Sequence, residues 1–389
     1  MFRLGPPKYS LGIDIGSSAL KFVQMKKTKQ GPQIINHGHE KYSAGVFQDG
    51  VLQDPSAVIQ MIKNLKKEYG LKYDQVFTAI TSSNTILRFL PLPDMGDEEL
   101  AHAIDGEAEQ YVPYPLDTVN IHFAKLAKVE QEGMTRILCL LAVAQKEYVE
   151  NIVDIFKSVG VSQLDCLDID SLAIINALNN FLQKSPQGEQ IGDDNSLDDM
   201  EQIQDSADIG AESSSDDEVV AIVSIGARST IINVLKDGIL RFSRNVPISG
   251  NNITDVIRSV YKVTVEEAED IKIEKSKEAV EGNEDQEFSD VVHTTVEEIA
   301  GEIRRSFDYY KAQHREPVIH RVFLTGGTAK LKDIDVLLSN ELSVDVEIAD
   351  PSYGLLKDMD NPELFEENLQ EYTVAIGLAL RGCATNEDA

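Results

Sequence analysis

One strand–turn–strand pattern occurs in both halves of the chain, and this repeat is the strongest constraint on its fold. Residues 11–23 are LGIDIGSSALKFV, and residues 219–235 are VVAIVSIGARSTIINVL. Each copy has an apolar run, an Ile-Gly pair, small polar residues and a second apolar run, which is typical of a β-hairpin. A repeat at this distance indicates a duplicated domain rather than a solenoid, whose units recur every ~20–50 residues.

Along the rest of the chain, apolar runs that predict strands alternate with amphipathic stretches that predict helices. Helices are expected at 56–69, 96–110, 146–160, 171–181 and 252–261, followed by a long charged helical region and a closing helix. Further strands are expected at 76–80, 136–144, 163–170, 239–246 and 321–327. This alternation predicts an α/β fold.

The first turn has two interpretations. In one, Asp14 caps the turn through its own backbone. In the other, the hairpin binds phosphate: Gly16 lets backbone N–H groups approach an anion, Ser17 and Ser18 donate hydrogen bonds, and Asp14 holds a hydrated Mg²⁺ through water. Both interpretations remain open on this segment alone.

A third element follows the second hairpin. Residues 321–331, RVFLTGGTAKL, predict a strand that ends in Gly326 and Gly327 and enters a helix. Backbone at such a point can lie against a flat base or its phosphates. A Gly-Gly pair by itself is more often a plain turn, but two hairpins and this pair, in this order, predict a nucleotide site.

Composition restricts the partners. The formal net charge is −30, whereas nucleic acid and anionic lipid are bound by clustered Lys and Arg. We therefore expect no nucleic-acid partner. No apolar run approaches the ~18 residues of a spanning helix, so direct membrane insertion is not expected. Three cysteines without metal or disulfide spacing fit a reducing compartment, and a cytoplasmic location is expected.

The stretch 182–217 differs from its surroundings. It is rich in Asp, Glu, Ser, Gly and Gln and has no aromatic residue. Such a composition buries too little apolar surface to offset the entropy of ordering, so the segment is predicted to be disordered. A linker between domains and a loop inserted within one domain both remain possible.

The motifs resemble the actin-like ATPase superfamily and, within it, the PilM family of type IV pilus assembly, which is related to FtsA. The segments that carry the resemblance are GIDIGSSALKFVQM, LPLPDM, YVPYPLD, LDIDSLAIINA, IGARSTIINVLKDG, GNNIT and FLTGG, in that order. The resemblance covers the chain except 182–217. It implies an actin-like fold of duplicated RNase H-like domains with the extra subdomain of FtsA and PilM.

The resemblance also implies domain limits. The first actin-like domain would comprise residues 1–77 and 161–181, with the inserted subdomain at 78–160. The second would comprise 218–389, with a nucleotide-side subdomain at about 250–320. Two connecting helices would lie at 170–178 and 373–382.

Site residues follow from the same motifs. Those implied to bind nucleotide are Asp14, Gly16, Ser17, Ser18 and Lys21 in the first hairpin, Gly226, Ala227, Ser229 and Thr230 in the second, and Gly326 and Gly327 in the adenosine motif. Glu269 and Lys272 match positions that contact the ribose or base, although an i,i+3 ion pair on an exposed helix face explains them equally well.

Asp170 falls where the superfamily places the group that positions the attacking water; the alternative is a helix N-cap. Asp168 and Asp170 flank Ile169 at strand spacing, so both are expected on one face.

One position departs from the superfamily pattern. The second hairpin usually begins with Asp, and here the residue is Ser224. A hydroxyl is a poorer magnesium ligand than a carboxylate. We therefore expect ATP and Mg²⁺ to bind, with weak or no ATPase activity.

The function that the resemblance implies is a cytoplasmic ATP-binding scaffold of a type IV pilus machine or a related secretion machine. It would bind the N-terminal cytoplasmic peptide of a PilN-like inner-membrane protein, contact other inner-membrane platform proteins, and reach the membrane through them. One alternative is an FtsA-like cell-division protein, but the final residues, ALRGCATNEDA, have too few apolar side chains for its membrane-binding helix. A sugar or acetate kinase of the same fold is less favoured, because no catalytic base is evident beside the hairpins.

Overall fold

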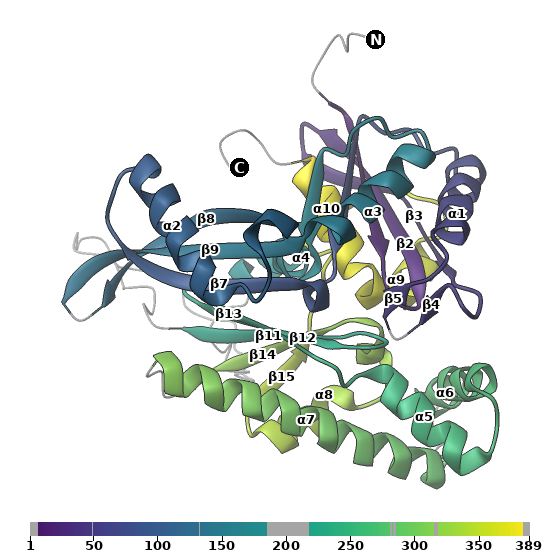
Figure 1. Cartoon of the computed structure of the whole chain (residues 1–389). Helices are drawn as coiled ribbons and strands as arrows, with labels where there is room; N and C mark the ends of the chain where they lie inside the picture. Colours follow the sequence, from purple (N-terminus) through teal and green to yellow (C-terminus); the bar gives the residue numbers. More distant parts are fainter. Residues whose placement is uncertain are drawn as a thin grey trace, which may run out of the picture.

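Two β-sheets of matching topology form the body of the molecule (Figure 1). The computed structural model describes residues 7–48, 50–131, 133–184, 218–280, 282, 285–314 and 318–383. The first sheet has the order β10-β6-β1-β2-β3-β16, with β1 (Tyr9–Ile15), β2 (Ala19–Thr28), β3 (Gly31–Lys41), β6 (Gln75–Ile80), β10 (Cys166–Ile169) and β16 (Leu356–Lys357). The second has the order β13-β12-β11-β14-β15, with β11 (Val219–Ile225), β12 (Thr230–Lys236), β13 (Ile239–Val246), β14 (Arg321–Thr325) and β15 (Asp345–Ile348).

The strand pairings confirm the duplication. In the first sheet β1, β2 and β3 form an antiparallel meander, and β6 and β10 add to it in parallel. In the second sheet β11, β12 and β13 form the same meander, and β14 and β15 add in parallel. The two copies of the hairpin motif therefore occupy equivalent places in two equivalent sheets.

Two helices lie between the sheets. They are α4 (Asp170–Lys184) and α10 (Thr373–Arg381), the predicted connecting helices. Ile174 and Leu178 of α4 pack against the second sheet, and α10 packs on β1 and on α4. The packing is tight: a Cβ atom built on Gly377 would overlap the carbonyl oxygen of Ala173, so only glycine fits this crossing.

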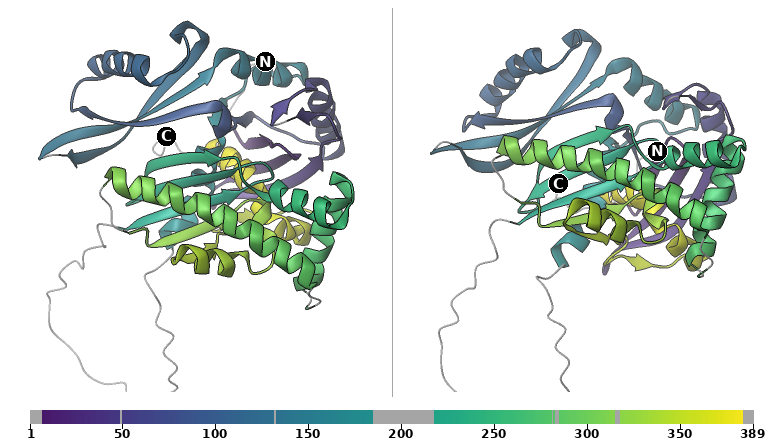
Figure 2. Two further views of the ribbon diagram at one scale, coloured as in Figure 1. Left: turned by 60° about the horizontal axis from the view of Figure 1, so that its bottom comes forward. Right: turned by 90° about the horizontal axis from the view of Figure 1, so that it is seen from below.

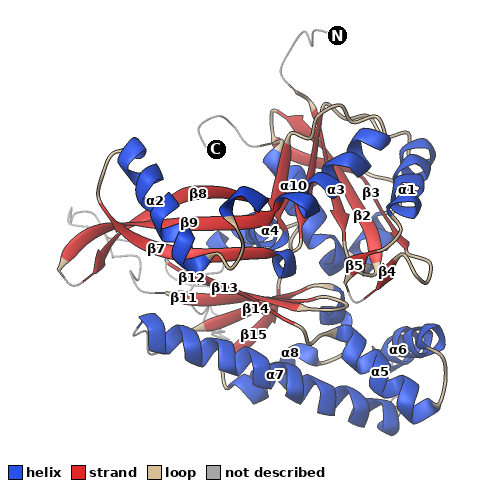
Figure 3. Ribbon diagram, in the orientation of Figure 1, coloured by secondary structure: helices blue, strands red, loops and turns tan. Residues whose placement is uncertain are grey.

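The outer face of each sheet is also covered by helices (Figure 3). On the first sheet these are α1 (Pro55–Glu68) and α3 (Lys146–Ser158). On the second they are α5 (Gly250–Tyr261), α7 (Gln286–His314) and α8 (Ile334–Leu342), with α6 (Val265–Val280) packed beside α5. The layers therefore alternate as helix, sheet, helix pair, sheet, helix. Within the described residues, no helix has both the length and the apolar character to cross a membrane.

The inserted subdomain projects to one side of the two sheets (Figure 2). Its three-stranded sheet has the order β7-β9-β8, with β7 (Thr85–Pro93), β8 (Val119–Gln131) and β9 (Met134–Gln145), and α2 (Asp97–Tyr111) covers one face. The predicted range of 78–160 is too long. Helix α3 belongs to the core of the first sheet, where Ile152, Ile155 and Phe156 are buried.

The predicted second domain, 218–389, also needs correction at its C-terminal end. Strand β16 pairs with β3, and α9 (Pro362–Glu367) follows it. Phe365 and Tyr372 are fully buried against Val23 and Met25 of β2. Burying these two rings against the apolar side chains of β2 is favourable. Residues 356–383 therefore pack on the first sheet and not on the second.

Most predicted helices are confirmed within two or three residues, although α4 extends to Lys184, into the stretch predicted to be disordered. Residues 185–217 lie outside the described part of the chain. Strands β3, β7 and β8, the short strands β4 (Phe47–Gln48) and β5 (Val51–Leu52), and the division of the charged helical region into α6 and α7 were not predicted.

Candidate nucleotide site

The first hairpin brings Asp14 and Lys21 together. They are direct partners in the register of β1 and β2, and the Lys21 Nζ lies 3.0 Å from the Asp14 Oδ2. Both side chains are only 13–14% exposed. A Cβ atom built on Gly16 would lie 2.8 Å from the Lys21 Nζ, so the lysine lies over the turn. A lysine held above a glycine turn, next to a carboxylate, provides the groups that a phosphate site and a metal site require.

Asp170 is the first residue of α4. Within this helix its side chain accepts only from the next amide, that of Ser171, and not from an N2 or N3 amide as an N-cap does. Its Oδ1 accepts hydrogen bonds from the backbone N–H of Ser82 at 2.8 Å, from the Ser82 hydroxyl, and from the backbone N–H of Ser171 at 2.7 Å. Burial raises the pKa of Asp170 to about 7; the Ser82 and Ser171 donors oppose this rise, and Asp14 adds to it. The carboxyl therefore changes charge near neutral pH.

Asp168 does not share this site. Its Oδ2 accepts a hydrogen bond from the Arg381 Nε at 2.7 Å, at the end of α10, and Asp168 itself is buried. The prediction that Asp168 and Asp170 share one face is wrong, because β10 ends at Ile169 and Asp170 already belongs to the helix.

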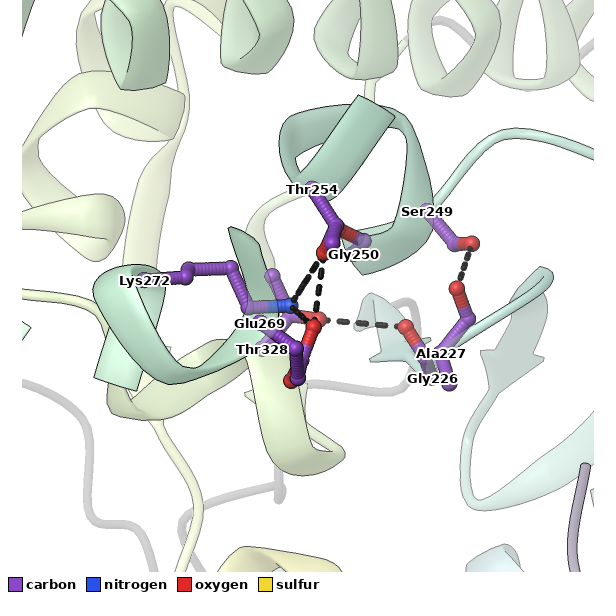
Figure 4. A network of polar contacts seen from close by, with 8 residues as sticks. All are labelled: Gly226, Ala227, Ser249, Gly250, Thr254, Glu269, Lys272 and Thr328. Atoms are coloured by element: carbon purple, nitrogen blue, oxygen red, sulfur yellow. Dashed lines mark hydrogen bonds and ion pairs between the residues drawn. The ribbon is translucent and has the colours of Figure 1, made fainter. Parts of the chain in front are cut away.

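The turn of the second hairpin, 226–229, is held by the start of α5 (Figure 4). The Gly226 carbonyl accepts from the Gly250 N–H at 3.1 Å, and the Ala227 carbonyl accepts from the Asn251 N–H at 2.7 Å and the Ser249 hydroxyl at 2.6 Å. Because trans peptide groups are planar, the N–H groups of the same two peptide units point away from α5. The turn therefore directs amide donors away from the helix that holds it.

Glu269 and Lys272 belong to a network that reaches this turn (Figure 4). The Lys272 Nζ lies 2.7 Å from the Glu269 Oε2, and both side chains contact the Thr254 hydroxyl, at 2.9 and 2.7 Å. Burial alone would raise the pKa of Glu269, but Lys272 and Thr254 outweigh it and lower that pKa. The Lys272 side chain is 13% exposed and the Glu269 side chain 35% exposed, so this i,i+3 ion pair is partly buried rather than fully solvated.

The Gly-Gly turn lies directly against the second hairpin. Gly326 has φ +88°, and a Cβ atom there would lie 2.5 Å from the Ile225 carbonyl oxygen. The Thr328 hydroxyl donates to the Gly226 carbonyl at 3.1 Å (Figure 4). On its other side, Gly327 approaches Glu371, whose Cγ would lie 3.3 Å from an added Cβ. The Gly-Gly turn is thus in contact with both the second hairpin and Glu371.

Contacts between the two halves converge on these motifs. Lys330, beyond the Gly-Gly turn of the second half, forms an ion pair with Glu371, which belongs to the segment 356–383 on the first sheet. Glu371 in turn interacts electrostatically with Lys21 of the first hairpin. Lys41, at the end of β3, interacts electrostatically with Glu269. The β4–β5 turn also reaches the second hairpin, because a Cβ on Gly50 would lie 3.7 Å from the Arg228 Nε.

The residues present fit a nucleotide with Mg²⁺. Lack of a side chain lets Gly16 lie under the Lys21 amine and lets Gly326 lie against the Ile225 backbone, and the second hairpin directs N–H groups away from α5. Lys21 supplies positive charge, and the Asp14 carboxylate is the kind of oxygen group that can hold a hydrated cation. Ser224 is buried in β11 beside Thr325, at the position where the superfamily pattern has Asp.

Several residues of this region were missed from the sequence. They are Ser82, Thr254, Thr328, Lys330 and Glu371. Glu371 lies two residues before the predicted connecting helix at 373–382, and Ser82 lies two residues after the predicted strand 76–80, so position relative to the ends of these elements was an available signal. Thr254 and Lys330 carried no such signal, because only the three-dimensional packing brings them to the motifs.

The fold and the candidate site define the class: the chain has an actin-like ATPase fold, with the two matching hairpins and the Gly-Gly turn in place. The ethanolamine utilization protein EutJ from Carboxydothermus hydrogenoformans shares this fold, with a TM-score of 0.55 at 18% identity over 98% of this chain and 92% of that one. Cell division protein FtsA of Staphylococcus epidermidis is 19% identical over 375 residues, which cover 88% of this chain and 75% of the relative. FtsA of Bacillus subtilis is 26% identical over 183 residues, 42% of this chain and 38% of its own length.

The family is more specific than the fold. A family model described as type IV pilus assembly protein PilM matches residues 12–193 and 201–383, and the chain belongs to this family. A solved PilM-PilN type IV pilus biogenesis complex is similar in structure, with a TM-score of 0.78 at 25% identity over 97% of this chain and 99% of that chain. The predicted family and fold are thereby confirmed.

Proposed function

We propose that this pilus-assembly protein binds ATP with Mg²⁺ where its two halves meet. Two observations carry the proposal: the turn at Gly226 contacts the Gly326-Gly327 turn, and Lys21 of the first hairpin interacts electrostatically with Glu371 beside Gly327. Lys21, the serine hydroxyls and the turn amides would bind the phosphates, and Asp14 would hold the cation through water. The base would lie beside Gly326 and Gly327, close to Glu269 and Lys272.

Binding without rapid hydrolysis is the second part of the proposal. Ser224 replaces the carboxylate that would otherwise help to hold the metal, so the cation is less firmly fixed. Single-turnover hydrolysis at saturating ATP tests this part. We expect very slow turnover in the unmodified protein and faster turnover in Ser224→Asp; brisk turnover in the unmodified protein would contradict it.

Calorimetric titration of ATP in the presence of Mg²⁺ tests the binding itself. One ATP per chain is expected. Lys21→Met should weaken binding at least tenfold, because it removes a poorly exposed cation from the phosphate turn. Lys157→Met is the matched control, since Lys157 forms an exposed ion pair on α3. Equal affinity in the two variants would exclude the first hairpin as the phosphate site.

The partner we propose is the N-terminal cytoplasmic peptide of a PilN-like inner-membrane protein. The support is the similarity to PilM in the PilM-PilN complex over nearly the whole of both chains. Such a peptide, together with other platform proteins of the machine, would place this chain in the cytoplasm at the inner membrane. A pull-down with the synthetic peptide and with a sequence-scrambled peptide tests the proposal; equal retention of the two would contradict it.

The FtsA-like role is less well supported, because the FtsA relatives are distant in sequence while the family model is PilM. A kinase role would require phosphoryl transfer to a sugar or acetate. A coupled assay over these acceptors distinguishes it, since the proposed scaffold should transfer phosphate to none of them.

A further inference from the structure

Ser82 is bonded to Asp170 twice, through its backbone N–H at 2.8 Å and through its hydroxyl. The Ser171 N–H adds a third bond at 2.7 Å. All three donors go to the same oxygen, Oδ1. Among the described residues, no hydrogen bond is made to Oδ2 of Asp170. One oxygen of the carboxyl is therefore fixed by the protein, and the other remains for a ligand or water.

The position of Ser82 follows from the strand pairing. Strands β6 and β10 run parallel, with Ile80 opposite Ile169 at their ends. The residues that follow these strands must therefore lie side by side, and these are the 3₁₀ turn Ser82–Asn84 and the start of α4. The turn leads directly into β7, the first strand of the inserted subdomain. Ser82 thus joins that subdomain to the candidate site.

The surroundings of Asp170 favour its neutral form. Burial is the largest influence, and Asp14 on β1 adds a like charge. From α3, Tyr148 interacts with the same carboxyl. Against these stand the Ser82 and Ser171 donors, which favour the charged carboxylate. The hydroxyl of Ser82 is the only one of the three donors that a side-chain substitution can remove.

We propose that Ser82 is a positioning residue of the nucleotide site: it fixes Asp170 through Oδ1 and leaves Oδ2 directed to the bound ligand. This role rests on the proposed function, because the ligand is the nucleotide or its attacking water. A carboxyl held through one oxygen keeps a single orientation, as preorganised polar groups at reaction sites do. Without the hydroxyl, the carboxyl is both less fixed and more easily protonated.

The test is the pH titration of Asp170 in nucleotide-free protein, followed by the carboxyl ¹³C resonance of protein labelled at Asp and assigned with Asp170→Asn. Ser82→Ala should move the midpoint upward by about one pH unit, because one hydrogen bond to the charged form is lost. Ser82→Thr keeps a hydroxyl and should restore the midpoint. Ser83→Ala is the matched control, since Ser83 lies exposed in the same turn and bonds Thr81 instead.

A midpoint in Ser82→Ala within about 0.2 pH units of the unmodified protein would overturn the proposal. A second measurement is the pH dependence of ATP affinity. Ser82→Ala should shift this dependence in the unmodified background and leave it unchanged in the Asp170→Asn background. An equal effect in both backgrounds would assign Ser82 a merely structural role. Because the carboxyl titration needs no nucleotide, failure of ATP binding would contradict the proposed function and still leave the Ser82–Asp170 contact measurable.

Discussion

Gly326 lies so close to Ile225 that a Cβ atom on the glycine would be 2.5 Å from the isoleucine carbonyl oxygen. The φ of +88° adds a conformational cost for any other residue. Gly326→Ala should therefore lower the free energy of unfolding by about 2–4 kcal/mol and weaken ATP binding. Urea denaturation of Gly238→Ala gives the control, because Gly238 also has positive φ but open space around its Cβ position. Equal losses in the two variants would show that the close approach is unimportant.

The Asp14–Lys21 pair predicts different effects from its two members. Asp14→Asn should leave phosphate binding by Lys21 intact and remove most of the dependence of ATP affinity on Mg²⁺, because the carboxylate is the proposed metal-side group. Lys21→Met should weaken ATP at every Mg²⁺ concentration. Calorimetry at several Mg²⁺ concentrations separates the two patterns. Identical Mg²⁺ dependence in Asp14→Asn and the unmodified protein would exclude Asp14 from the metal site.

The crossing of α4 and α10 predicts opposite results for the same substitution at two helical glycines. Gly377→Ala should destabilise the protein by about 2–4 kcal/mol, because its Cβ would overlap the Ala173 carbonyl. Gly301→Ala in α7 meets no atom within 4 Å and should stabilise by about 0.5–1 kcal/mol through helix propensity. Thermal or urea unfolding measures both. A stabilised Gly377→Ala variant would mean that the two central helices are not in close contact.

The pH dependence of stability should carry the signature of Asp170. Its pKa is raised to about 7, chiefly by burial, so the folded protein holds a proton that the unfolded chain releases near pH 4. Stability from this group is therefore present at low pH and lost as pH rises from about 4 to about 7. Asp170→Asn should remove a loss of about 2–4 kcal/mol over this interval. Superimposable pH–stability curves for the two proteins would contradict the buried carboxyl.

The repeated hairpins and the alternation of strands and helices were sufficient to predict the duplicated α/β fold, because both are local patterns with clear periodicity. The return of residues 356–383 to the first sheet was not predictable in this way. It depends on Phe365 and Tyr372 fitting against β2, and nothing in their own segment specifies that partner.

In the candidate site, too, the residues of local motifs were predictable, whereas contacts between distant segments of the chain were not. Asp14, Lys21 and Gly326 belong to local motifs and were predicted with their neighbours. The contacts of Asp170 with Ser82, and of Gly327 with Glu371, join residues that are distant in sequence. Asp168 was misplaced because strand periodicity was extended one residue past the end of β10.

The most direct test of the central claim is a crystal structure of the protein with ATP and Mg²⁺. We expect the triphosphate between the turn at Gly16 and the turn at Gly226, with the base beside Gly326 and Gly327. A nucleotide bound elsewhere, or no bound nucleotide at millimolar ATP and Mg²⁺, would contradict it.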